Sequence, residues 1–427
     1  MTEPTKTRRG REAGFRFIFA AALMNAVSFG IMIPVLPNLV KQLSGGDTAD
    51  ASTWNALFAV SWGLMQLCVA PLLGMLSDRI GRRPVMLISF GGLAIDFLFM
   101  AFAPSLFWLF VGRLINGATA ASFSTANAYV ADVTAPQDRA KTFGLMGSAF
   151  SFGFLIGPAL GGFLAGEWMT SYLGDFALRV PFLAAAGLTA VNWLYGLFVL
   201  PESLPPEKRQ KSFQWRQAIP LVSLSFLGKH GDLLGLAGVN FLFQLAHTVL
   251  PSIFVLYAGY RYGWGADIVG LSMMATGILG ILVQTLLVGP VVARIGERGA
   301  LLLGTLAGAV GFALYGWAPT GWAYLASAPV FALMNFMQPG LQGLMTRRVG
   351  PQQQGQLQGA NQGLQGIASV AGPMVFGLTF AWAVRHDASL HMPGLPIYIA
   401  AGLMVAAYLL SLRVGHAPRG AVPAAAE

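Results

Sequence analysis

The side chain with the clearest capacity for chemistry is Asp96, the carboxylate that lies well inside a long apolar run, residues 84–104. If this run crosses a membrane, a charge at its centre costs about 2.5–3.5 kcal/mol on insertion scales, so it must face a cavity or a partner. A carboxyl group placed there can carry a proton or bind a polar substrate. The next apolar run, 106–131, contains Arg113, so a fixed Asp96–Arg113 ion pair is the alternative.

Uncharged polar side chains recur at helical spacing in other apolar runs. Such amides either join helices, at about 0.6 kcal/mol each, or line a water-filled cavity. Three separate stripes in the second half of the chain favour a cavity. The candidate substrate or proton contacts are Asn116 and Asn127, which follow Arg113, and then Asn240, Gln244, His247, Asn335, Gln338, Gln342, Asn361 and Gln365.

The elements that must position these residues are membrane-spanning helices. The mean hydropathy is +0.63, and 55% of the residues are hydrophobic while 10% are charged, which is not a soluble globular composition. Apolar runs of the length needed to cross a bilayer give twelve predicted spans. They are 15–41, 53–76, 84–104, 106–131, 140–166, 178–200, 233–259, 267–293, 299–318, 322–346, 356–384 and 395–413.

The positive charges predict the orientation. If both termini are cytoplasmic, 21 of the 26 Lys and Arg residues fall on the cytoplasmic side and four on the other, while Arg113 lies within a span. This bias is the positive-inside rule, and it excludes nucleic acid as the reason for the net charge of +9. We therefore expect a multi-pass protein of the inner, cytoplasmic membrane.

The two halves of the chain repeat each other at an offset of 215 residues. Gly74, Arg79, Ile80, Gly81 and Arg83 recur as Gly289, Arg294, Ile295, Gly296 and Arg298, and the same offset relates "GPALGG" at 157–162 to "GPMVFG" at 372–377. It also relates Pro136-Gln137 to Pro351-Gln352. An even number of spans per half makes the repeats parallel. The predicted domains are two six-helix bundles, 1–200 and 233–427, joined by a cytoplasmic loop, 201–232.

Several stretches carry a family resemblance. "GMLSDRIGRRPVML" (74–87) resembles the signature between the second and third helices of the major facilitator superfamily, and "GPALGG" resembles that of its drug/proton antiporter branch. The bacterial tetracycline/proton antiporters are the narrower likeness. It rests on "GIMIPVLPNLV" (30–40), "LMQLCVAPLLGMLSDRIGRRPVMLISF" (64–90), "GRLINGATAA" (112–121), "FGLMGSAFSFGFLIGPALGGFLAG" (143–166), "RYGWGADIVGLS" (261–272) and "GQLQGANQGL" (355–364).

The resemblance implies roles for particular residues. It implies that the 74–87 loop is a conformational latch that closes the cytoplasmic side in one state, although ordinary positive-inside anchoring is the alternative. It matches Asp96, Arg113, Gln66 and Gln284 to polar family positions, and it puts aspartates at Asn25 and Gly308 and a histidine at Gly280. The latch residues are Gly74, Asp78, Arg79, Gly81, Arg82 and Arg83.

Small residues in the fifth and eleventh spans predict packing and gating, not binding. Glycine at helical spacing allows two helices to approach closely, and proline allows bending. The residues are Gly153, Gly157, Pro158, Gly161 and Gly162, with Gly372 and Pro373 in the repeat.

No H-E-x-x-H, G-x-S-x-G, Walker or Cys/His zinc pattern occurs in the sequence, so we expect neither an enzyme nor a cofactor. His386, Asp387 and His391 are too sparse a group to predict a metal site. We expect a monomer that exports amphipathic, drug-like compounds in exchange for protons, with the lipid bilayer as its surroundings. A proton-independent exporter or an uptake transporter is one alternative, and a non-transporting sensor or lipid-handling protein is another.

Overall fold

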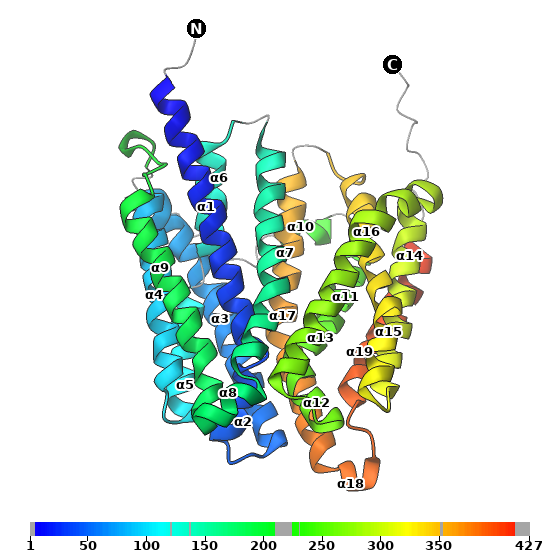
Figure 1. Cartoon of the computed structure of the whole chain (residues 1–427). Coiled ribbons are helices and arrows are strands. Elements are labelled where there is room, and N and C mark those ends of the chain that lie inside the picture. Colours follow the sequence, from blue (N-terminus) through cyan, green and yellow to red (C-terminus); the bar gives the residue numbers. More distant parts are fainter. Residues whose placement is uncertain are drawn as a thin grey trace. The chain divides into compact units, whose positions relative to one another are not determined.

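The computed structural model describes residues 5–119, 122–135, 138–209, 224–229, 231–350 and 353–414, which form helices joined by short turns (Figure 1). The repeated Pro-Gln pairs and residues 210–223 of the expected central loop lie outside these residues. The helices of the first half are α1 (Thr5–Met32), α2 (Leu36–Leu43), α3 (Thr48–Ile80), α4 (Arg82–Phe102), α5 (Leu106–Thr119), α6 (Ser122–Val133), α7 (Arg139–Leu164), α8 (Glu167–Leu173) and α9 (Val180–Val199).

The second half is built in the same way. It is preceded by α10 (Leu224–Lys229), and its helices are α11 (Gly231–His247), α12 (Val249–Tyr262), α13 (Ala266–Leu282), α14 (Val288–Trp317), α15 (Gly321–Ala332), α16 (Met337–Thr346), α17 (Gln354–Arg385), α18 (Asp387–Leu390) and α19 (Leu395–Val414). A single π-helical turn, Val283–Leu287, joins α13 to α14.

Each predicted span lies largely in helix over its described residues: a turn at 33–35 interrupts the first span, and residues 120–121 of the fourth lie outside the described part. Within the described residues, nine helical stretches are long and apolar enough to cross a membrane, and Leu106–Thr119 is a shorter apolar helix. One of the nine, Ala266–Trp317, covers two predicted spans, and its backbone breaks between them at Gly296, where φ is +71°. Gly81, 215 positions earlier, ends α3 with φ of +113°. Both breaks need the left-handed backbone region that glycine adopts without a steric penalty.

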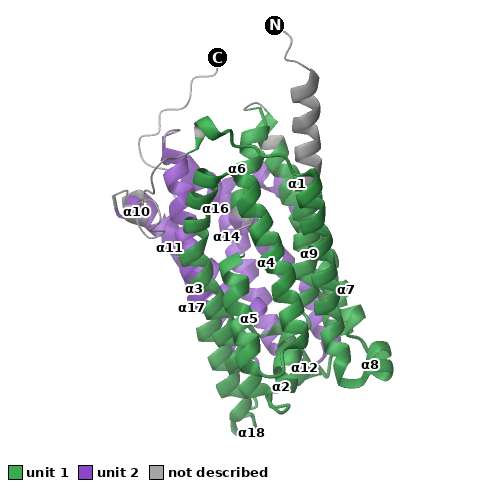
Figure 2. Ribbon diagram, turned by 90° about the vertical axis from the view of Figure 1, so that its left-hand side faces the viewer, with its two compact units in different colours: residues 1–220, 252–277, 373–393 green, residues 221–251, 278–372, 394–427 purple. Residues whose placement is uncertain are grey.

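The contacts divide the chain into two compact units, shown in Figure 2. Unit 1 is residues 1–220 with 252–277 and 373–393, and unit 2 is 221–251, 278–372 and 394–427. The division therefore differs from the predicted boundary at 201–232, because two segments of the second repeat pack within unit 1. The two-bundle organisation of the repeats stays a prediction.

Helices α1 and α7 pack closely in unit 1 because glycines remove the side chains between them. A Cβ at Gly157 would lie 2.5 Å from the Cα of Gly30, and one at Gly153 would meet Ala26. Gly161 similarly faces the backbone of Ile31. These contacts agree with the predicted packing role of the small residues.

Unit 1 also contains contacts between the first repeat and the two added segments. A Cβ at Gly162 would meet the carbonyl of Ala266, where α13 begins. The Ser52 hydroxyl donates a buried 2.8 Å hydrogen bond to the Gly377 carbonyl, and Arg385 pairs with Asp50 at 2.6 Å. These residues lie at the helix ends that the predicted orientation places on the side opposite the termini.

Candidate functional site

Asp96 is buried in the interior of unit 1. Its side chain lies on α4 with no exposed surface, and its Oδ2 accepts a 2.5 Å hydrogen bond from the amide of Asn116 on α5. The other carboxyl oxygen, Oδ1, has no hydrogen-bond partner. A Cβ at Gly112 would lie 3.3 Å from that oxygen, so glycine leaves space beside it. A buried carboxyl oxygen without a partner is costly in a purely structural role.

Arg113 lies beside this carboxyl group without a direct bond to it. Its guanidinium lies 5.8 Å from the centre of the Trp62 ring, and its Nη1 is 3.4 Å from the sulfur of Met32. The Trp62 indole donates a 2.8 Å hydrogen bond to Asn116. The ion pairs found in the described part of the chain do not join Asp96 to Arg113. The two charges are linked instead through Trp62 and Asn116.

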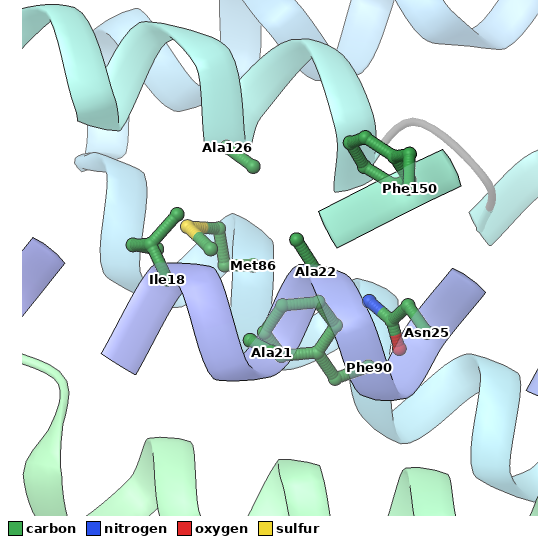
Figure 3. A pocket seen from close by; sticks show the side chains of 8 residues that line it. All are labelled: Ile18, Ala21, Ala22, Asn25, Met86, Phe90, Ala126 and Phe150. Atoms are coloured by element: carbon green, nitrogen blue, oxygen red, sulfur yellow. The ribbon is translucent and has the colours of Figure 1, made fainter. Parts of the chain in front are cut away.

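Asn25 lies in a small pocket of the same unit, which Figure 3 shows. It is 5% exposed, and its carbonyl oxygen accepts a 3.2 Å hydrogen bond from Asn192 on α9. The other residues that line the pocket are apolar: Ile18, Ala21, Ala22, Met86, Phe90, Ala126 and Phe150. A neutral amide pair therefore occupies the position where the resemblance places a carboxylate.

Some of the predicted amides in unit 2 join neighbouring helices. Asn240 on α11 donates to Asn361 on α17 at 3.1 Å, and Gln358 on α17 donates to Gln342 on α16 at 3.3 Å. The first pair is buried. These contacts favour the helix-joining interpretation for these residues. Asn240 is also the counterpart of Asn25 at the offset of 215.

Other predicted polar residues are more open. Gln284 is exposed in the π-helical turn, a distortion that is frequent at functional sites. The Asn335 amide donates to the Ala332 carbonyl of its own helix. The remaining residues are half-buried or exposed, which suits cavity lining: Gln66, Asn127, Gln244, His247, Gln338 and Gln365.

Gly308 and Gly280, where the resemblance places an aspartate and a histidine, differ in the space around them. A Cβ at Gly308 would lie 2.5 Å from the Cε of Met404 and 3.1 Å from the sulfur of Met334. A Cβ at Gly280 would lie 3.3 Å from the Asn335 amide nitrogen. The Gly308 position is therefore closely packed with apolar groups and cannot hold a carboxylate without rearrangement.

The 74–87 loop forms a charge network at the start of α4. Arg82 pairs with Asp78 at 2.5 Å and with Asp132 at 3.2 Å. Arg83 donates to the Leu197 carbonyl at the end of α9. The space beside Gly74 is open. These contacts lie within unit 1, and the role of residues 74–87 as a latch stays a prediction.

Glu202 belongs to this network although the sequence did not single it out for this role. Its carboxylate accepts hydrogen bonds from the backbone amides of Arg82 and Arg83, at 2.9 and 3.3 Å, and so caps the start of α4. The sequence did offer one indication of this role: Glu202 comes directly after the sixth predicted span, in a loop near other charges. Trp62 and Asn192 were also missed, and each is a polar group inside an apolar span.

Within the described residues, no group of three His, Cys, Asp or Glu side chains is placed to hold a metal ion. Asp387 instead accepts a 2.8 Å hydrogen bond from the Tyr260 hydroxyl.

Membrane-length apolar helices in a chain with two sequence repeats are typical of polytopic membrane transporters. The chain belongs to the Major Facilitator Superfamily, whose sequence profile matches residues 18–373. It is 36% identical to the class C tetracycline resistance protein of Escherichia coli, over 85% of this chain and 89% of that protein. It is 34% identical to the class G protein of Vibrio anguillarum, over 88% and 94%.

Solved structures agree with this fold. The nucleoside transporter NupG superposes with a TM-score of 0.72 at 16% identity, over 94% of this chain and 98% of that one. The human organic anion transporter TETRAN gives 0.65 at 23% identity, over 96% and 100%. At these identities the likeness concerns the fold alone.

Proposed function

We propose that this protein exports amphipathic, drug-like compounds, tetracycline-like or broader, across a bacterial inner membrane in exchange for protons. The observation that carries the proposal is the buried Asp96 carboxyl group with one oxygen unpartnered, in a chain 30–36% identical to several tetracycline resistance proteins. The drug and the membrane come from those relatives, and both termini are placed in the cytoplasm by the positive-inside rule.

Asp96 is the group we assign to the proton. A coupled exporter needs a side chain that is protonated in one state and ionised in the other, and burial and access to water change this balance in a carboxyl group. Asn116 holds one carboxyl oxygen and leaves the other available to a proton or a substrate. We infer one proton for each transport cycle.

The substrate surface combines apolar walls with neutral amides. The pocket at Asn25 is apolar apart from that residue, and the half-buried or exposed amides of unit 2 offer donors and acceptors without a fixed charge. The chain also contains 30 Phe and 17 Met residues, and methionine adapts its shape to varied ligands. These features suit export of amphipathic compounds of more than one kind.

Alternating access requires contacts that form in one state and break in another. The periplasmic-end contacts of unit 1 are candidates for such state-dependent contacts, because they join the first repeat to segments of the second. The Asp50–Arg385 pair and the Ser52–Gly377 hydrogen bond are both of this type. We assign closure of the outer side to them, and closure of the cytoplasmic side to the 74–87 latch. The protein would complete this cycle as a monomer.

Proton-independent transport is the second candidate, because the sites of two family carboxylates are uncharged here. Asn25 pairs with another amide, and Gly308 is packed against methionine side chains. With both positions neutral, Asp96 has to support coupling alone.

The test is accumulation of radiolabelled tetracycline by everted membrane vesicles with an imposed pH gradient, acid inside. The proposal predicts accumulation that requires the gradient and collapses with a protonophore. Vesicles without the protein are the control. Accumulation that ignores the gradient would support the proton-independent candidate, and no accumulation of tetracycline or of a panel of amphipathic drugs would overturn the proposal.

A further inference from the structure

The two repeats carry an ion pair at equivalent positions, with the charges exchanged. In the first repeat, Arg82 at the start of α4 pairs with Asp132 at the end of α6. Adding the offset of 215 to each residue gives Glu297 and Arg347, and these two also form an ion pair, between α14 and the turn after α16. Each pair lies within one unit, so the comparison does not depend on how the units are placed.

The surroundings of the two pairs are also equivalent. One member of each pair directly follows a glycine with positive φ: Arg82 follows Gly81, and Glu297 follows Gly296. The next residue in each repeat is an arginine that donates to the carbonyl of a leucine on the last helix of that repeat. Arg83 donates to Leu197 at 2.8 Å and Arg298 donates to Leu412 at 3.2 Å, again 215 residues apart at both ends. The backbone junction and its arginine anchor are therefore repeated, while the polarity of the pair differs. Arg82 also pairs with Asp78, whose counterpart in the second repeat is Ala293.

The packing around Glu297 fits the exchanged charge. A Cβ at Gly340 would lie 2.6 Å from the Glu297 carbonyl oxygen, and one at Gly343 would lie 2.6 Å from its Cγ. Gly340 therefore lets the backbones of α16 and α14 approach closely, and Gly343 leaves the room that the Glu297 side chain occupies. The Glu297 side chain is 22% exposed and that of Arg347 is 72% exposed. The anion is the inner member here, whereas the inner member in the first repeat is the cation Arg82.

We propose that Glu297 and Arg347 are positioning residues that hold the junction before the second part of α14, as Arg82 and Asp132 hold the start of α4. We call these four residues the paired clasps. What each repeat requires is a pair of opposite charges at these two positions, and either polarity serves. The transport readout of this inference rests on the proposed export function.

Charge exchange tests the second clasp. Glu297→Arg and Arg347→Glu each place two like charges together, which is destabilising because the partner is left beside a repelling charge. We expect each single variant to lower the maximal export rate about tenfold, with the substrate KM and the amount of protein in the membrane unchanged. The double variant restores the pair in the polarity of the first repeat and should recover most of the rate. Arg294→Glu, at an exposed position of α14 just before Gly296, is the matched control and should have little effect.

A second readout does not need transport. In a Cys68→Ser background, Ala300→Cys, at a buried position of α14 shortly after Gly296, reports the opening of the junction through its rate of labelling by a maleimide in everted vesicles. Glu297→Gln, which removes the charge with little change in shape, should raise this rate, and the charge-exchanged double variant should return it toward the original value.

The outcomes separate this inference from the proposed function. If the original protein exports nothing while the labelling rates change and recover as described, the function fails and the clasp stands. Single variants with unchanged export and unchanged labelling would overturn the clasp. A double variant that recovers neither the rate nor the labelling would overturn it too, since opposite charges alone would then be insufficient.

Discussion

Replacing Gly153 by alanine tests how closely α1 and α7 must pack. A Cβ at this position would lie 2.8 Å from the carbonyl carbon of Ala26 and 2.8 Å from the amide nitrogen of Val27, and it would also meet the Ala26 Cβ. Ordinary contact begins at 3.4 Å. Backbone atoms cannot move aside alone, so the two helices must separate by about half an ångström.

Overpacking of this kind costs about 1–3 kcal/mol. Alanine is a better helix former than glycine by about 1 kcal/mol, which offsets part of that cost. Gly147 lies on the same helix with nothing within 4 Å of its missing Cβ, so Gly147→Ala is the matched control and should be neutral or slightly stabilising.

The assay is the midpoint of thermal unfolding of the purified protein in detergent. We expect Gly153→Ala to unfold several degrees below Gly147→Ala, at about 2 °C for each kcal/mol. Adding Ala26→Gly removes one of the three clashing atoms and should recover part of the difference. Equal midpoints for Gly153→Ala and Gly147→Ala would refute the packing argument.

Three further predictions concern other parts of the molecule. Asp78→Asn should abolish export while insertion stays normal, because it removes a charge partner of Arg82 and not a span; near-normal flux would count against the latch. Trp62→Phe keeps an aromatic ring but loses the indole N–H that donates to Asn116, so proton release on substrate addition should fall. Unchanged release would exclude a role for Trp62 in positioning Asn116. Gly308→Asp should lower stability in detergent by about 1–3 kcal/mol and be relieved by Met404→Ala; a stable single variant would show that this site opens freely.

The helices and the repeat could be predicted from the sequence because both depend on local patterns. Apolar runs of membrane length locate the spans. The offset of 215 rests on short motifs that carry backbone requirements, and the positive φ of Gly81 and Gly296 is one such requirement. The burial of Asp96 follows from the cost of a charge in an apolar run.

The hydrogen-bond partners could not be predicted because they come from distant parts of the chain. Trp62 reaches Asn116 across 54 positions, and Glu202 reaches Arg82 across 120. No local spacing indicates such pairs. The composition of unit 1 could not be predicted for the same reason. Residues 252–277 and 373–393 pack with the first repeat, and such contacts between distant segments depend on the whole fold.

The central claim is that Asp96 carries the exchanged proton, and proton release on substrate addition tests it most directly. Purified protein in detergent at low buffering capacity is mixed with tetracycline, and the pH change is followed with an indicator dye. Asp96→Asn is compared with the original protein and with Glu207→Gln, which removes an exposed carboxylate from the loop after α9. We expect release from the original protein and from Glu207→Gln, and none from Asp96→Asn. Undiminished release from Asp96→Asn would contradict the account.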